Sequence, residues 1–257
     1  MKSFVNSRFV ALLLSTLLLV APAFSTAALS PASRAILDEA AESVDQEKES
    51  LAALEALKKR PRSEVLKALR DGIANGQPWI IVSARAALAL EAKELLPDLM
   101  KAAEKEDAWQ VFSAIEQLSR DSSERPAVEA LFTRKLAKAP SSSKVAILDA
   151  FSNGKTQLPK SSFDALIKDE SLGVRRAVVR QFLASREAYS NDEQIRRFKL
   201  AFTMKPYQAR LDALLMYGAI PAAKRRSIAS AFDPGLCAKE ANASVKSACE
   251  TIAKEAK

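Results

Sequence analysis

Apolar residues recur at three- and four-residue spacing through most of the chain, which is the period of amphipathic helices. Proline residues and short polar clusters interrupt this pattern at regular intervals, for example at Pro61, Pro97 and Pro159. The stretches between interruptions are mostly about 10–18 residues long, the length of ordinary helices joined by short turns. Runs of Val, Ile and Thr with period-two alternation are absent, so strands are not expected. The pattern predicts an all-α fold.

Similar nine-residue segments recur along the chain, each with small or apolar residues at or near its first, fifth and ninth places. They are ARAALALEA (84–92), QVFSAIEQL (110–118), SKVAILDAF (143–151), VRRAVVRQF (174–182), YQARLDALL (207–215) and VKSACETIA (245–253). Partner helices are predicted between them, at 92–105, 127–139, 161–169 and 192–204. Each unit is thus a helical hairpin that cannot bury its apolar face alone and must stack on its neighbours.

One stretch, DESLGVRRAVVRQFL at 169–183, relates these units to a known family. The helix in this stretch resembles the second helix of a HEAT repeat. The resemblance lies in Asp169 in the turn before the helix, Val174 and Arg175 at its start, and Ala177. The resemblance covers about 80–255 and implies a right-handed α-solenoid of stacked antiparallel helical hairpins, whose role is binding, most often of proteins. It also implies that Arg175 is a structural brace to the acidic turn at Asp169.

The N-terminus has the three regions of a secretory signal: MKSFVNSR with two basic residues, an apolar run at 9–20, and small residues at 21–28. Cleavage fits best after Ala27 or Ala28, and an uncleaved membrane anchor is the alternative. The chain therefore divides into a signal peptide (1–27), an N-terminal helical segment (28–78, acidic at 38–49) and the repeats (79–257). We expect a periplasmic or secreted protein with no integral membrane segment in its mature form.

Export gives the only two cysteines, Cys237 and Cys249, a structural meaning. On one continuous helix, residues twelve apart would be separated by about 18 Å, which is too far for a disulfide bond. A turn near Asn242 or Ser244 would bring them together, so we expect a C-terminal hairpin closed by a disulfide.

Charge is unevenly distributed along the chain. Residues 171–230 contain 12 Lys or Arg and 4 Asp or Glu, a net charge of +8. Residues 28–107 contain 12 Lys or Arg and 15 Asp or Glu, a net charge of −3. No acidic residue close in sequence neutralises Arg176 and Arg180. This basic patch supplies the partner-binding candidates, which are Arg176, Arg180, Arg196, Arg197, Lys199, Lys224, Arg225 and Arg226.

A protein partner with an acidic surface fits this patch, and an anionic envelope polymer or lipid is the alternative. Nucleic acid is not expected, because an exported protein seldom meets it. Trp79 and Trp109 could stack on a ligand, but each lies in a helix-period apolar row that is more typical of a core.

Nothing in the sequence indicates catalysis directly. The chain has no His, which excludes His-activated nucleophiles and His-based metal sites, and we expect no enzyme, cofactor or metal site. A helical hydrolase with a carboxylate pair stays open, although Glu116, Asp149, Asp164 and the other acids are scattered among helices.

Overall fold

The computed structural model describes residues 31–45, 47–202, 207–217, 225–226, 228–229 and 234–255. Within these ranges every regular element is a helix, as the apolar spacing predicted. The proposed signal peptide at 1–27 and the candidate residue Lys224 lie outside the described residues. Among the helices that the structure describes, none combines the length and apolarity that crossing a membrane requires.

The first part of the chain contains α1 (Pro31–Glu42), α2 (Glu47–Glu55), the 3-10 helix η1 (Ala56–Lys59), α3 (Arg62–Ala74) and α4 (Trp79–Ala89). It is followed by η2 (Lys93–Leu95), α5 (Leu96–Ala103), α6 (Trp109–Ser119), α7 (Arg125–Leu136), α8 (Ser141–Asn153) and α9 (Lys160–Leu166). The last part contains α10 (Leu172–Ala184), η3 (Arg186–Ala188), α11 (Asn191–Phe202), α12 (Tyr207–Tyr217), α14 (Pro234–Ala238) and α15 (Ala243–Glu255).

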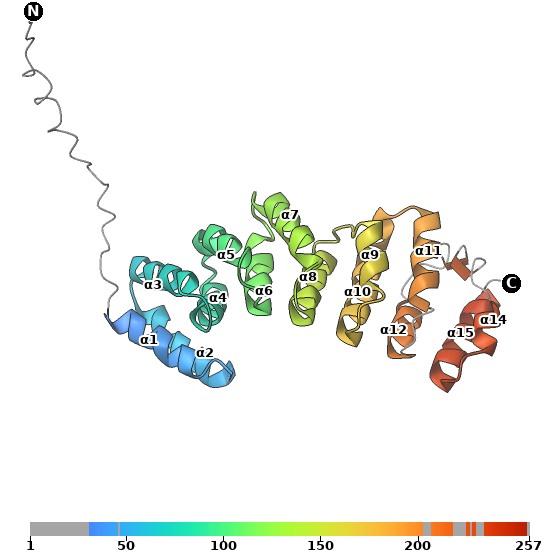
Figure 1. Ribbon diagram of the computed structural model, residues 1–257, viewed down its shortest axis with the longest axis horizontal. Coiled ribbons are helices and arrows are strands. Elements are labelled where there is room, and N and C mark those ends of the chain that lie inside the picture. The colour runs from blue at the N-terminus through green and yellow to red at the C-terminus, as the bar shows by residue number, and fades with distance from the viewer. Residues whose placement is uncertain are drawn as a thin grey trace, which may run out of the picture.

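The helices form an elongated row with two edges (Figure 1). The helices α5, α7, α9 and α11 lie along one edge, and α4, α6, α8, α10 and α12 lie along the other. Along the second edge each helix packs against the next, and α12 also packs against α15. We call this series, from α4 through α12 to α15, the continuous layer.

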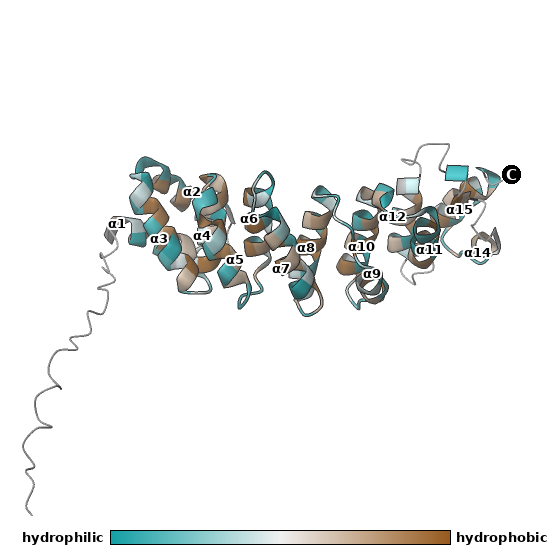
Figure 2. Ribbon diagram, turned by 90° about the horizontal axis from the view of Figure 1, so that it is seen from above, coloured by the Kyte–Doolittle hydropathy of each residue, from teal (hydrophilic) through white to brown (hydrophobic). Residues whose placement is uncertain are grey.

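Small side chains explain why the helices of the continuous layer pack so closely. Ala87, Ala114, Ala150, Ala177 and Ala213, one from each of five successive helices, are at most 1% exposed. The distance between two packed helices depends on the side chains at their contact, so alanine lets the axes approach. Figure 2 shows polar and apolar segments alternating along most helices, as expected when only part of each helix surface is packed.

Buried apolar side chains form one continuous cluster from Leu37 in α1 to Ile252 in α15. Aromatic rings join the two edges of the row within it. Phe132 of α7 lies 5.7 Å from Phe112 of α6 and 6.3 Å from Phe151 of α8, centroid to centroid. Such contacts add to the hydrophobic gain from burying each ring, and they fix α7 against both neighbouring helices.

The C-terminal hairpin is closed as the sequence predicted. Cys237 in α14 and Cys249 in α15 form a disulfide bond, with their α carbons 5.5 Å apart. The turn between the helices is set by Asn242, whose Oδ1 accepts a hydrogen bond from the backbone N–H of Val245 at 3.1 Å.

Candidate binding groove between α6 and α8

The arginines predicted to bind a partner are largely engaged within the protein. The guanidinium of Arg176 donates two hydrogen bonds to the carboxylate of Asp212 in α12. Arg180 donates one from Nη2 to Oδ1 of Asp149 in α8, at 3.1 Å. These acids lie 36 and 31 residues away in sequence. The expectation that both arginines lack an acidic neighbour is therefore wrong, because the pairing reaches across adjacent helices.

Arg197 is not a surface residue. Its side chain is 2% exposed, and the guanidinium lies 4.1 Å above the ring centroid of Tyr189 and 4.6 Å above that of Phe163. It also donates hydrogen bonds to Glu193 and to the backbone carbonyl of Leu158. The assignment of Arg197 to a partner-binding surface is wrong, because the side chain is enclosed between α9 and α11.

Arg196 is also paired within the fold. It bonds both carboxylate oxygens of Glu193 and one oxygen of Asp164 in α9, all within 2.8 Å. Hydrogen bonds from Arg196 and then from Arg197 hold the pKa of Glu193 down at about 2, although partial burial opposes them. The cluster thus joins α9 to α11.

Arg175 and Asp169 do touch, but through the backbone. Nη1 of Arg175 donates to the carbonyl oxygen of Asp169, whereas the Asp169 carboxylate accepts from Nζ of Lys144 at 2.8 Å and from the N–H of Ser171 at 2.9 Å. Burial raises the pKa of Asp169, but these hydrogen bonds outweigh burial and leave the pKa below its ordinary value. The Asp169 carboxylate therefore contacts α8 through Lys144, and Arg175 contacts the turn itself.

Of the three remaining candidates that the structure describes, one is paired and two are not. Arg225 lies 3.6 Å from the carboxylate of Glu255. Lys199 and Arg226 are exposed and have no ion pair within the described part of the chain. The acids that neutralise the basic patch include Asp149, Asp164 and Glu255, all outside 171–230. The net charge of that region therefore overstates how positive its surface is.

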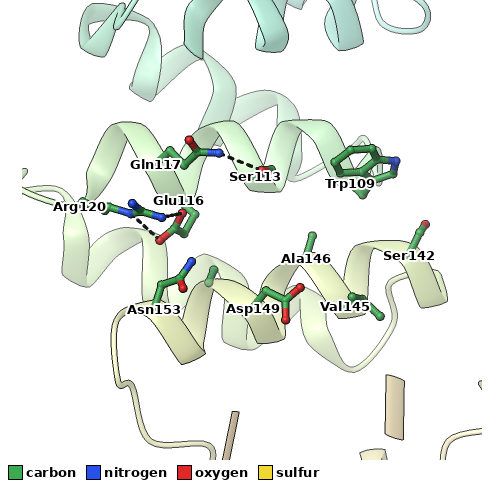
Figure 3. A pocket seen from close by; sticks show the side chains of 11 residues that line it. Trp109, Ser113, Glu116, Gln117, Arg120, Ser142, Val145, Ala146, Asp149 and Asn153 are labelled. Atoms are coloured by element: carbon green, nitrogen blue, oxygen red, sulfur yellow. Dashed lines mark hydrogen bonds and ion pairs between the residues drawn. The ribbon is translucent and has the colours of Figure 1, made fainter. Parts of the chain in front are cut away.

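A more distinct surface feature is a groove of about 440 Å³ between α6 and α8. Its wall on α6 is formed by Trp109, Ser113, Glu116, Gln117 and Arg120, and its wall on α8 by Ser142, Val145, Ala146, Asp149, Ala150 and Asn153. Both sets follow three- and four-residue spacing, so each is one stripe of its helix. Ser113 and Ala146 are small, which leaves space between the two stripes (Figure 3).

Trp109 stands at one end of this groove (Figure 3). It is 45% exposed, although its neighbours Val111 and Phe112 are fully buried. The interpretation of Trp109 as a core residue is wrong, because position 109 starts α6 on the groove stripe rather than on the packed one. Trp79, by contrast, packs against the core and donates from Nε1 to Oδ1 of Asp38 at 2.8 Å.

Arg120 and Glu116 form the opposite end. Nε and Nη2 of Arg120 donate to the two carboxylate oxygens of Glu116 at 3.0 and 3.1 Å. The Glu116 side chain is 5% exposed and that of Arg120 is 54% exposed. The hydrogen bonds to Glu116 raise the pKa of Arg120 above its ordinary value. A buried carboxylate thus fixes the guanidinium in place and leaves its Nη1 group available to a ligand.

Asp149 lies between these two ends, on the α8 side (Figure 3). Its side chain is 49% exposed. Only Oδ1 is bonded to Arg180, and among the residues that the structure describes nothing donates to Oδ2. The groove therefore has an apolar end at Trp109, an open acceptor at Asp149 and a fixed donor at Arg120.

The groove also brings two acids together, since Glu116 and Asp149 line the same cavity. Each of these carboxylates is held by a guanidinium, since Glu116 accepts hydrogen bonds from Arg120 and Asp149 accepts one from Arg180. In the part of the chain that is described, no three metal-ligating side chains gather into a potential metal site. The two carboxylates of the groove are thus bonded to arginines of α6 and α10.

Sequence reasoning considered Trp109, Glu116 and Asp149 separately and missed that they share one groove. A signal was present in the repeat offset: the segments at 110 and 143 begin 33 residues apart, so Trp109 aligns with Ser142 and Glu116 with Asp149. Residues at equivalent positions of stacked units project from the same face. Comparison with protein-family models, with curated proteins and with solved structures finds no match for this chain.

Proposed function

We propose that the protein is an exported, non-catalytic binding protein built as a right-handed, HEAT-like α-solenoid, and that it binds a partner protein through the groove between α6 and α8. The observation that carries the proposal is the half-exposed Trp109 at a preformed groove on the continuous layer. Tryptophan is enriched among residues that dominate interface energies, because it buries a large amphipathic surface.

Long-range pairing supports the solenoid part of the proposal. Ion pairs between different elements join residues separated by similar distances in sequence, for example 28 for Arg70 and Asp98, 31 for Arg180 and Asp149, and 30 for Arg210 and Glu240. Such a period is expected when each repeat contacts only its neighbours. The disulfide bond between Cys237 and Cys249 supports export, since disulfide bonds persist in oxidising compartments.

The binding test compares the purified protein with a Trp109→Ala variant. An envelope extract is passed over the immobilised protein, the captured protein is identified by mass spectrometry, and the purified pair is measured by calorimetry. We expect Trp109→Ala to weaken binding by about 30-fold, the effect of losing a hot-spot side chain.

Tyr207→Ala is the matched control. Tyr207 is also the first residue of a helix in the continuous layer and is 42% exposed, but it lies in α12, away from the groove. Equal affinity of the Trp109→Ala variant and the unmodified protein would contradict the proposed binding surface.

A carboxylate-pair hydrolase is the second candidate, because Glu116 and Asp149 line one groove. It requires turnover that Glu116→Gln and Asp149→Asn each abolish. Fluorogenic glycoside and ester substrates test this directly, and turnover that survives both substitutions excludes this pair as the catalyst. An anionic polymer or lipid as ligand has less support, because most of the predicted arginines are paired within the fold.

A further inference from the structure

The groove between α6 and α8 has a length that fits an extended peptide. Trp109 and Arg120 are eleven residues apart on α6, which corresponds to about 16 Å along the helix axis. An extended chain advances about 3.3 Å per residue, so about five residues span this distance. The groove is also narrow enough to be lined by two facing stripes of side chains, as Figure 3 shows.

The charge of the groove selects the side chains of such a peptide. Its lining contains the carboxylates of Glu116 and Asp149 and the single guanidinium of Arg120. Arg180 approaches Asp149 from α10 and bonds only Oδ1, so Oδ2 is left for a ligand. A basic side chain could donate to Oδ2 of Asp149, whereas an acidic side chain would lie beside this open carboxylate oxygen. At this position the groove therefore favours a basic side chain, unlike the acidic partner that the sequence predicted.

The distance along the groove determines which peptide side chains can reach Trp109 and Asp149. Asp149 lies opposite Ser113, one helical turn from Trp109 (Figure 3), which is about 6 Å along the axis. In an extended chain, residues two apart point to the same side and are separated by about 7 Å. An apolar side chain on Trp109 therefore places the side chain two residues away, on the Asp149 side, beside that carboxylate.

The rest of the groove suits the peptide backbone. The amide groups of Gln117 and Asn153 and Nη1 of Arg120 lie beyond Asp149, toward the polar end. Peptide N–H and C=O groups need hydrogen-bond partners when they leave water. The fixed guanidinium of Arg120 can donate to a peptide carbonyl without losing its bond to Glu116.

We propose, on the basis of the binding function above, that the groove takes an extended peptide segment of the partner in which an apolar residue on Trp109 lies two positions from a lysine or arginine at Asp149.

The experiment uses the protein labelled with nitrogen-15 and three nine-residue peptides. Each peptide is rich in glycine and serine and carries one leucine; two positions later it has lysine, glutamine or glutamate. The protein has two tryptophans, so two indole N–H signals appear, and a Trp109→Phe variant assigns them. We expect the lysine peptide to shift the Trp109 signal and leave the Trp79 signal in place. Its affinity should be about three- to tenfold higher than that of the glutamate peptide.

Two variants test the role of Asp149. In Asp149→Asn, the lysine and glutamine peptides should bind with equal affinity, since the charge is lost but the side chain still accepts a hydrogen bond. Glu39→Gln is the control, because it removes an exposed carboxylate from α1, outside the groove. It should leave the preference for lysine unchanged.

The outcomes separate this inference from the function on which it rests. Tighter binding of the glutamate peptide, or no saturable shift of the Trp109 signal with any peptide, overturns the peptide proposal. A shift caused by a neutral oligosaccharide such as cellohexaose, with none from the peptides, overturns it in favour of a glycan. If capture of a protein from the envelope extract still depends on Trp109, the binding function stands without the peptide motif. If capture does not depend on Trp109, both the binding function and the peptide proposal fail.

Discussion

The contact between Gly72 of α3 and Ser83 of α4 shows how a single atom limits the choice of residue. A β carbon at Gly72 would lie 2.1 Å from Oγ of Ser83, whereas the Ser83 β carbon is 3.5 Å away. The Ser83 hydroxyl is buried and has no hydrogen-bond partner. It therefore adds little to stability, but it must move if position 72 carries a β carbon.

This contact predicts that Gly72→Ala is destabilising alone but stabilising when Ser83 is also replaced by alanine. Gly72→Ala alone should lower the free energy of unfolding by about 1–3 kcal/mol through overpacking. Ser83→Ala alone should leave the free energy of unfolding nearly unchanged. The double variant should have a free energy of unfolding about 0.5–1 kcal/mol above that of the unmodified protein, since alanine is a better helix former than glycine. Urea denaturation of the four proteins measures these values, and an equal loss in the double variant would show that the hydroxyl is not the obstacle.

At the scale of residues, the local sequence pattern misjudges the burial of two side chains. Trp109 lies in an apolar row but points into the groove, because the first residue of α6 is on the groove stripe and Val111 is on the opposite, buried side of the helix. Arg197 lies in a basic run but is buried, because the rings of Phe163 and Tyr189 enclose it. Neither outcome follows from local spacing, since both depend on residues of a neighbouring element.

The packing of α11 against α9 depends on ionised Glu193. Its side chain is 22% exposed and bonds both Arg196 and Arg197, while Arg197 reaches the Leu158 carbonyl just before α9. Breaking such a cluster leaves the buried Arg197 guanidinium without its charged partner. This element contact should therefore be sensitive to acid.

The pH dependence follows from the lowered pKa. Glu193 has a pKa of about 2 in the folded protein, below the ordinary value of 4.5, so its charge stabilises the folded state above about pH 4.5. This contribution is lost as the pH falls toward 2. We expect Glu193→Gln to cost about 2–3 kcal/mol at pH 7 and progressively less below pH 4.5. Denaturation at several pH values measures this, with the exposed Glu170→Gln as control; a pH-independent difference would rule out the charge as its cause.

Apolar spacing located most helices of the continuous layer, since the predicted segments 110–118, 143–151 and 174–182 fall within α6, α8 and α10. Proline marked helix starts closely: α3 and α9 begin directly after Pro61 and Pro159. Pro97, expected to interrupt a helix, instead lies in the first turn of α5, and Pro126 lies likewise in the first turn of α7. Proline is tolerated there because the N–H that it lacks has no partner within the helix.

Charge behaves differently at the scale of the whole molecule than along the sequence. A count over 171–230 gives a net +8, but Arg180, Arg196 and Arg210 pair with acids about 30 residues away. Because each helix of the continuous layer packs against the next, residues about 30 positions apart are neighbours in space. A window of sixty residues therefore cuts through these pairs and counts one partner of each. The offset of about 30 residues between packed helices, rather than the local charge, would have predicted them.

The arrangement in a row also predicts how far a local defect spreads. The C-terminal hairpin packs through α15 onto α12 and has no comparable contact with α4, α6 or α8. The bond between Cys237 and Cys249 closes a short loop and should contribute about 3 kcal/mol. If stability is a sum over units and their interfaces, a Cys237→Ser/Cys249→Ser variant should lose amide-exchange protection in α12, α14 and α15.

Hydrogen exchange read by mass spectrometry tests this. Protection in α6 and α8 should be unchanged in the variant, and binding at the Trp109 groove should persist with the same affinity. Binding at Trp109 reports whether the part of the row distant from the hairpin is intact, because the groove depends on the packing of α6 against α8 and not on the C-terminal hairpin. Uniform loss of protection along the whole chain would mean that the row unfolds as one cooperative unit.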